Sequence, residues 1–321
     1  MTDTIVEESD NTEFRHTPVL LNETLQGLKI RSDGVYVDCT FGRGGHSRAI
    51  LEQLEENGRL LAFDKDPDAI AAVDEKLLDD PRFTLVHGSY TKLEETVKAM
   101  KLTKKVNGVF LDLGVSSPQL DDASRGFSFM RDGDLDMRMD NSHGMTAAEW
   151  LNLASAEEIA NVIYEYGDER FSRRIARVIV EQRKEAPITR TIQLADLVAS
   201  TIPSREKNKH PATRTFQAIR IFINRELEEL DAVLTQAMNV LSVNGRLLVI
   251  SFHSLEDRLV KRFMRDQSRG VDIPREIPVT HDVFKPKLTI IGKPVRSQPD
   301  DIKNNPRARS AVLRIAECPA P

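Results

Sequence analysis

Four short apolar runs, separated by stretches of helical pattern, constrain the fold of this chain more than any other feature. The runs have the length and composition of buried strands, and they lie at residues 35–37, 59–63, 83–86 and 109–111. A helix is expected to begin at Asp66-Pro67, because Asp caps helices well and Pro suits a first helical turn. Strands that alternate with helices are typical of a parallel sheet covered by helices, so this half of the chain predicts an α/β fold.

The pattern changes after Ser117-Pro118, where an irregular segment over residues 125–140 is followed by helices without intervening strands. Ser155 and Glu158 form a capping box at the start of one helix, and Gly167 is placed to end it. Further amphipathic helices are expected at residues 171–183 and 191–200, ahead of a charged break at 203–211.

The sheet pattern then returns. Apolar residues recur at helical spacing from Ile219 to Met238, ahead of Asn244-Gly245, and residues 246–252 are expected to form a fifth strand. We therefore predict one α/β domain, discontinuous in sequence, with a helical unit inserted into it. The expected limits are 15–120 and 211–321 for the α/β domain, 121–210 for the all-helical insertion and 1–14 for a disordered acidic tail.

Several classes of protein are disfavoured by what the sequence lacks. No apolar run approaches the roughly 20 residues needed to span a bilayer, and the acidic start is unlike a secretory signal. The two cysteines, Cys39 and Cys318, give no basis for a disulfide framework or a zinc cluster, so a reducing cytoplasm is expected. An Asp132-x-Asp134-x-Asp136 pattern lacks the Gly and Glu of a calcium loop, so no metal is expected.

Charge is distributed unevenly along the chain. The formal net charge is -5, yet residues 170–225 hold thirteen Lys/Arg against four Asp/Glu, and residues 258–314 hold fourteen against six. Basic stretches of this kind suit a polyanionic partner such as RNA, but a solvated helix face and a basic chain end would give the same counts. Charge therefore leaves both interpretations open.

A glycine-rich loop follows the first expected strand and contains Gly42, Gly44, Gly45 and His46. Glycines allow a tight turn and the close approach of a ligand, whether that ligand is a dinucleotide, a phosphate or S-adenosylmethionine. The acidic residue directly before the loop, Asp38, would repel a pyrophosphate but attract the ammonium group of S-adenosylmethionine. The loop therefore favours S-adenosylmethionine over a nicotinamide cofactor.

Three further positions at strand ends extend this interpretation. Asp64 could accept the hydroxyls of an adenosine ribose, Tyr90 could pack against the adenine, and Asp112 ends the fourth strand where the reacting group should lie. Asp112, Ser116 and Ser117 supply oxygen acceptors that could hold the hydrogens of an exocyclic amine, a poor nucleophile that needs careful placement. Methylation at carbon normally uses a cysteine nucleophile, and this loop has none.

Seven segments resemble the bacterial RsmH (MraW) family, which implies a Rossmann-like (class I) methyltransferase. They are residues 16–21, 38–47, 111–120, 125–129, 210–216, 251–258 and 305–310. The resemblance implies methylation of the N4 amine of a decoding-centre cytosine, cytosine 1402, in small-subunit (16S) ribosomal RNA, with S-adenosyl-L-homocysteine as the second product. It also implies a homodimer and cofactor contacts from Gly44, Gly45, His46, Asp64, Tyr90, Asp112 and Gln119.

RNA contacts are expected from basic residues of the helical insertion and its flanks. The candidates for phosphate or base contacts are Arg173, Arg174, Arg177, Arg214, Arg220 and His253, each of which could instead be a solvated or structural residue. Apolar side chains of the irregular segment, Phe127, Phe129, Met130, Met137 and Met139, could shelter an extruded base or could pack as a lid on the core. Two alternatives to the methyltransferase remain, a nicotinamide-dependent oxidoreductase and an RNA-binding ribosome-assembly factor with a vestigial cofactor site.

Overall fold

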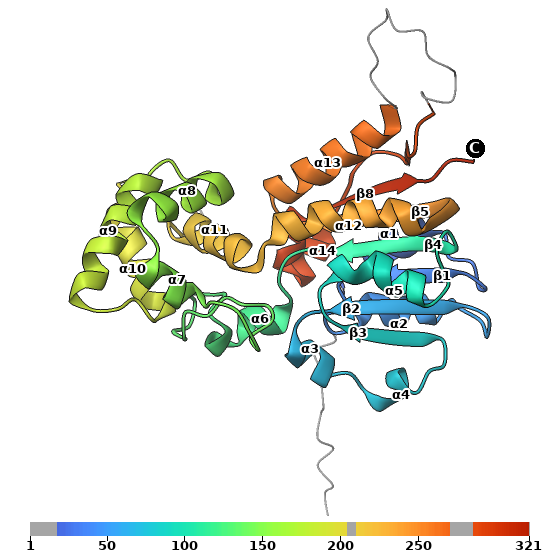
Figure 1. The fold of residues 1–321 in the computed structure, drawn as a ribbon, viewed down its shortest axis with the longest axis horizontal. Helices are drawn as coiled ribbons and strands as arrows, with labels where there is room; N and C mark the ends of the chain where they lie inside the picture. Colours follow the sequence, from blue (N-terminus) through green and yellow to red (C-terminus); the bar gives the residue numbers. More distant parts are fainter. Residues whose placement is uncertain (1–17, 204–209, 270–284, 321) are drawn as a thin grey trace, which may run out of the picture.

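The computed structural model describes residues 18–203, 210–269 and 285–320 (Figure 1). The expected acidic tail at residues 1–14 and most of the expected charged break at 203–211 lie outside the described residues. The strands are β1 (Val35–Asp38), β2 (Arg59–Asp64), β3 (Phe83–His87), β4 (Val106–Asp112), β5 (Leu241–Ser251), β6 (Thr289–Ile290), β7 (Val295–Arg296) and β8 (Val312–Glu317).

These strands form one eight-stranded sheet in the order β3-β2-β1-β4-β5-β8-β6, with β7 pairing on β8. Strands β1 to β5 are all parallel, whereas β8 runs antiparallel to β5. Helices α1 (Leu21–Leu28), α2 (Gly45–Leu51), α3 (Pro67–Ala71), α4 (Glu75–Leu78), α5 (Leu93–Ala99), α12 (Glu226–Val240), α13 (Ser254–Arg269) and α14 (Pro299–Asn304) surround the sheet, with short η1 (Tyr90–Lys92) and η4 (Pro306–Ser310). The predicted α/β fold, a parallel sheet covered by helices, is confirmed.

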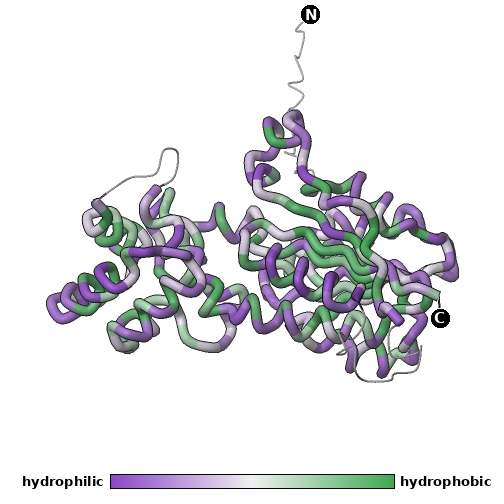
Figure 2. The backbone as a smooth tube through the Cα atoms, turned by 90° about the horizontal axis from the view of Figure 1, so that it is seen from above, coloured by the Kyte–Doolittle hydropathy of each residue, from purple (hydrophilic) through white to green (hydrophobic). Residues whose placement is uncertain are grey.

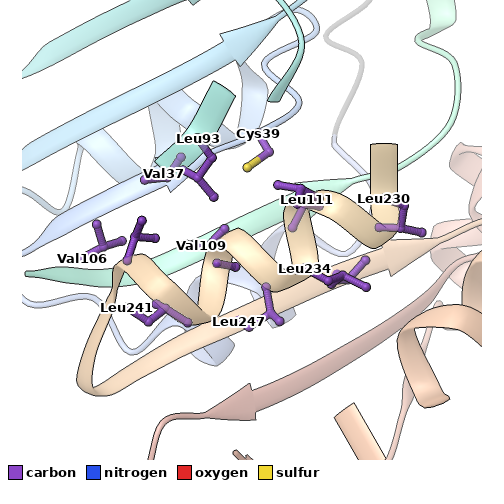
Figure 3. Packing of buried hydrophobic residues seen from close by; sticks show 14 of the residues in the cluster. Val37, Cys39, Leu93, Val106, Val109, Leu111, Leu230, Leu234, Leu241 and Leu247 are labelled. Atoms are coloured by element: carbon purple, nitrogen blue, oxygen red, sulfur yellow. The ribbon is translucent and has the colours of Figure 1, made fainter. Parts of the chain in front are cut away.

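Side-chain alternation along the strands builds a core on each face of the sheet. Val109 and Leu247 pack with Leu234 of α12 on one face (Figure 3). Their strand neighbours Phe110 and Leu248 point to the other face, where α1 and α2 cover them. Because side chains alternate with a period of two, both faces are apolar and each strand is a nearly continuous hydrophobic run.

A lobe of helices lies beside the sheet, seen at the left of Figure 1. Its helices are α7 (Ala147–Leu153), α8 (Ala156–Gly167), α9 (Ser172–Glu185), α10 (Thr191–Thr201) and α11 (Thr213–Asn224), reached through α6 (Ser117–Asp121) and η2 (Ala123–Arg125). The lobe has its own hydrophobic cluster, separate from the two sheet faces, and Figure 2 shows the polar outer turns of its helices. Phe216 and Ile219 of α11 belong to this cluster.

The predicted capping box at the start of α8 is present, with Ser155 Oγ accepting the Glu158 N–H and Glu158 accepting the Ser155 N–H. The helix ends at Gly167 as predicted, although the left-handed cap residue is Asp168, at φ 49°. The missing side chain of Gly167 also serves helix packing. A Cβ there would lie 2.8 Å from the Arg214 carbonyl oxygen of α11.

The apolar repeat predicted over residues 219–238 forms two helices rather than one. Arg225, at φ 52°, breaks the run between α11 and α12. Periodicity alone cannot show this break, because the helices on both sides have the same repeat. Strand β5 also starts earlier than predicted, at Leu241, and its pairing with β4 is irregular around Asn244, which has φ 60°.

Among the described residues, no helix has the length and apolar character needed to cross a membrane.

Candidate active site

A cavity of about 1250 Å³ opens where the parallel strands end. The predicted site residues that line it are Gly42, Gly45, His46, Asp64, Tyr90, Asp112, Ser116, Ser117, Gln119 and Arg220. Parallel strands bring their carboxyl ends to one rim of the sheet, which is why residues from β1, β2 and β4 meet here. Asp38, Gly44, Arg173, Arg174, Arg177, Arg214 and His253 do not line the cavity.

The glycine-rich loop owes its composition to backbone geometry. Gly42 (φ 56°) and Gly44 (φ 74°) are both left-handed, a conformation that costs other residues energy. A Cβ on Gly42 would have no atom of the described residues within 4 Å, so this position borders the open space of the cavity. A Cβ on Gly44 would lie 2.7 Å from the Phe41 ring, so that glycine allows close packing behind the cavity.

Asp38 supports this loop from below. Its side chain is 1% exposed and accepts hydrogen bonds from Ser47 Oγ (2.7 Å) and the Thr40 N–H (3.0 Å). The expectation that Asp38 faces the ligand therefore needs correction. The register explains its position, because Asp38 pairs with Ala62 and Phe110, two residues before the strand ends at Asp64 and Asp112.

Asp64 is held at the rim between two loops. Oδ2 accepts the Gly42 N–H at 2.7 Å and Oδ1 accepts the Asp66 N–H at 2.8 Å. Burial raises the pKa of Asp64 to about 6. A carboxylate offers about four acceptor positions, so two remain for hydroxyl groups of a ligand.

Asp112 and His46 carry polar atoms without protein partners. Asp112 Oδ1 and one ring nitrogen of His46 are buried without a hydrogen-bond partner among the described residues, while the His46 ring also interacts with the Val19 backbone. His46 Nε2 lies 3.7 Å from Asp112 Oδ2. Burial lowers the pKa of His46 to about 4, and burial with the charges of Asp38 and Glu256 raises the pKa of Asp112 to about 8. Both side chains are therefore neutral at pH 7. Buried polar atoms are normally paired, so these atoms point to a bound ligand.

The loop after β4 is shaped by a capping box at α6. Ser116 Oγ accepts the Gln119 N–H, Gln119 Oε1 accepts the Ser116 N–H at 2.8 Å, and Gln119 Nε2 donates to Asp66 Oδ2 at 2.7 Å. Gln119 is 6% exposed, so its amide mainly fixes the loop that carries Ser116 and Ser117 along the cavity.

A comparison of the whole sequence with models of known protein families agrees with this site geometry. Residues 13–318 match the model of the MraW methylase family. The chain belongs to this family. It is an S-adenosylmethionine-dependent methyltransferase, so the resemblance and the cofactor predicted from the sequence are confirmed and the nicotinamide alternative is dropped.

Three solved structures are among those with some likeness to the methylase. They are a candidate rRNA methylase of Clostridium thermocellum (13% identity, 94% of this chain and 97% of that chain, TM-score 0.44), an rRNA methylase of Streptococcus thermophilus (11%, 93% and 95%, 0.39) and NSun6 of Pyrococcus horikoshii (13%, 99% and 57%, 0.42). TM-scores this low give no support to any statement about substrate.

Two buried ion pairs at the cavity of the methylase were missed by the sequence reasoning. Arg125 Nη1 donates to Asp66 Oδ2 (3.0 Å), and Arg220 donates to both oxygens of Glu226 at 2.8 Å. Arg220, predicted as an RNA contact, is thus committed to Glu226, with only 15% of its side chain exposed. The sequence offered one clue to such a buried ion pair, because Arg220 is a charged residue at an inward-facing position of the apolar helical repeat.

His253, the other RNA candidate beside the sheet, also has a protein partner. Its Nε2 lies 3.1 Å from Glu256 Oε1, and the N–H groups of Phe252 and His253 donate to Glu256 Oε2. Glu256 therefore holds the start of α13, whereas the neighbouring Asp257 pairs with Arg314. Ligand atoms of Glu226, His253 and Glu256 lie within 4.8 Å of one another, but Arg220 and these N–H groups already occupy the carboxylates.

The remaining candidates lie in the helical lobe. Arg173, Arg174 and Arg177 are exposed on α9, at the end of the lobe far from the sheet (Figure 1). Arg214 donates to the Asp168 carbonyl oxygen at 3.2 Å. Of the apolar side chains in the irregular segment, Phe127, Met137 and Met139 are buried in the lobe core, whereas Met130 is 82% exposed.

Proposed function

We propose that this methylase transfers the methyl group of S-adenosylmethionine to the N4 amine of a cytosine in 16S ribosomal RNA, cytosine 1402 of the decoding centre. One observation carries the proposal. Buried, unpaired polar atoms of Asp112 and His46 face a cavity whose volume exceeds the roughly 300–1,000 Å³ of small-molecule pockets, which leaves room for a nucleotide beside the cofactor.

The rim of the sheet fits S-adenosylmethionine. Gly42 leaves space for it, Asp64 has acceptor positions for its ribose, Tyr90 offers an aromatic ring, and His46 has an unpaired nitrogen. Gly45 also lines the cavity, but its missing side chain makes room for Pro18. Asp38, Gly44 and Gln119 act behind them by holding the loops. When bound, the cofactor supplies an electrophilic methyl group on a sulfonium.

Asp112 is suited to hold the reacting base. A neutral carboxyl group both donates and accepts a hydrogen bond, and the edge of cytosine offers an N3 acceptor beside an N4–H donor. Holding that N–H places the amine and favours its attack, because positioning is the main requirement of this transfer. Ser116 and Ser117 line the same wall and supply further hydroxyl groups.

Methylation at carbon is disfavoured by the state of Cys39. This cysteine does line the cavity, which its sequence position did not suggest, but it is 1% exposed. Burial and the nearby Asp38 charge raise the pKa of its thiol well above the usual value, so a thiolate nucleophile is not available at neutral pH.

The partner is proposed to be ribosomal RNA within the small subunit, bound by the helical lobe and by basic residues near the chain end, and the proposed assembly state is a homodimer. The alternative of an RNA-binding assembly factor without methylation makes the opposite prediction in a direct test. Ribosomal RNA from cells that lack this protein should lose the N4-methyl group on the decoding-centre cytosine. The wild-type protein should restore it, whereas the Asp112→Ala variant should not. Persistence of that methyl group in the deleted strain would refute the proposed target.

A further inference from the structure

A second, smaller cavity of about 270 Å³ lies beside the first. Leu120, Asp121 and Arg307 contribute to the lining of both cavities, so the two are neighbours across a shared wall. This wall joins the loop that enters the helical lobe to η4, near the chain end. A ligand in the smaller cavity would therefore contact two segments that lie far apart in sequence.

The smaller cavity combines cationic and apolar side chains. Arg131 and Arg307 line it together with Met130, whose side chain is 82% exposed. Guanidinium groups bind phosphate oxygens in a two-pronged geometry, and an exposed flexible thioether can pack against a planar base. Anionic and planar apolar surfaces occur together in a nucleotide.

The two guanidinium groups are available to such a ligand. Arg131 is exposed and forms no ion pair within the described part of the chain, although Asp122 is near enough to feel its charge. Arg307 pairs with Asp121 at 3.0 Å, but 62% of the Asp121 side chain is exposed. Ion pairs of this exposed kind are weak, so Arg307 can exchange the carboxylate for a phosphate at little cost.

We infer that the smaller cavity binds the nucleotide that flanks the methylated base, with Arg131 and Arg307 on its phosphate and Met130 against its base. This inference rests on the proposed methyl transfer to RNA. A base that enters the larger cavity must leave its stack, and its neighbours then follow along the chain to the mouth. Arg307 lies in the wall that the two cavities share, where such a neighbour could meet it.

The test uses the full chain saturated with S-adenosylhomocysteine and a five-nucleotide single-stranded RNA with a central cytosine. Binding is followed by fluorescence anisotropy for the wild type, Arg131→Gln, Arg307→Gln and a matched control, Arg31→Gln, whose exposed arginine precedes β1 at the opposite rim. Each cavity variant should weaken binding by about tenfold, the loss of one charge-assisted contact, and the control should not. A neutral methylphosphonate linkage beside the cytosine should weaken wild-type binding more than it weakens either cavity variant, because each variant has already lost one of the two guanidinium groups that contact this phosphate.

A linkage that weakens the cavity variants as much as the wild type, variants that bind as tightly as the control, or no binding to the wild type would each overturn the inference. A parallel methylation assay on small subunits from the deleted strain separates the two proposals. Binding through these arginines without any methylation would leave the flanking site standing and refute the proposed function. Methylation by the wild type, together with cavity variants that bind RNA as tightly as the wild type, would leave the proposed function standing and refute the flanking site.

Discussion

Asp66 and Asp112 lie at the same cavity in opposite electrostatic situations. The Asp66 carboxylate is 5% exposed and accepts hydrogen bonds from Arg125 and Gln119, so its charge and its oxygens are both satisfied. The Asp112 carboxyl group has one oxygen without a partner among the described residues and a pKa raised to about 8. On the Asp66 side of the cavity the carboxylate is thus satisfied without a ligand, and on the Asp112 side the carboxyl group is not.

This difference separates residues that hold the site in its folded shape from residues that contact the ligand or the reacting base. Arg125 also donates to the Met139 carbonyl oxygen at 2.9 Å, so it connects the segment that enters the helical lobe to the start of α3. A substitution on the Asp66 side should therefore act first on stability. One on the Asp112 side should act first on activity.

The largest expected effect is on stability, from Arg125→Ala. Removing the guanidinium leaves the buried Asp66 charge with two neutral donors, the Gln119 amide and the Asp68 N–H, and breaking a buried pair in this way costs about 3–5 kcal/mol. Urea unfolding followed by circular dichroism measures the change. A double variant, Arg125→Ala with Asp66→Asn, should recover part of the loss, since it no longer buries an unpaired charge. If the single variant is as stable as the wild type, the Asp66 side does not hold the site.

Asp112→Ala should have the opposite profile. Its activity should fall by about 10²–10³-fold, the usual cost of losing one hydrogen-bonding group aimed at the reacting atoms. Its unfolding free energy should not fall, since no protein partner of the side chain is lost. Single-turnover methylation with radiolabelled cofactor gives the rate, and Asp112→Asn is the matched control, because a neutral amide retains hydrogen bonding. An alanine variant with normal turnover would remove Asp112 from the active site.

The sequence predicted the fold and the rim because both follow from strand patterns. Apolar runs located β1 to β5 to within a few residues, and parallel strand ends placed Asp64 and Asp112 together. Asp38 was misjudged, since a strand end in sequence does not give its register with β2 and β4. Arg125 and Arg220 were not recognised as buried partners because their carboxylates, Asp66 and Glu226, are identified only once the chain has folded.

A smaller effect is expected on the pH dependence of the unfolding free energy, which should arise on the Asp112 side of the cavity and not on the Asp66 side. Asp112 binds its proton more tightly when folded, so its contribution to stability is complete below about pH 4 and is lost as pH rises to about 8. His46 has a pKa lowered to about 4, so its contribution to stability grows as pH rises from about 4 to about 6.5 and is constant above that. Asp112 should therefore dominate from about pH 6.5 to 8, where the unfolding free energy of the ligand-free protein should fall by at most about 1.4 kcal/mol per pH unit. Urea titrations of Asp112→Asn should lack this slope, and a slope that persists would place the titrating group elsewhere.

The smallest expected effect is from Gly42→Ala, which tests whether the open space at the glycine-rich loop belongs to the ligand. Alanine in a left-handed conformation costs about 1–2 kcal/mol, and a Cβ at Gly42 would meet no protein atom within 4 Å. A modest loss of stability should therefore accompany a larger loss of affinity for S-adenosylhomocysteine, measured by calorimetry, because the new methyl group projects into the cavity.

Gly144→Ala is the matched control. That residue is also left-handed, at φ 82°, and also open, but it lies in the helical lobe segment outside the cavity lining. Equal affinity losses in the two variants would mean that backbone strain weakens binding, rather than a methyl group in the space of the ligand. Gly42 would then be a supporting residue, like those on the Asp66 side of the cavity.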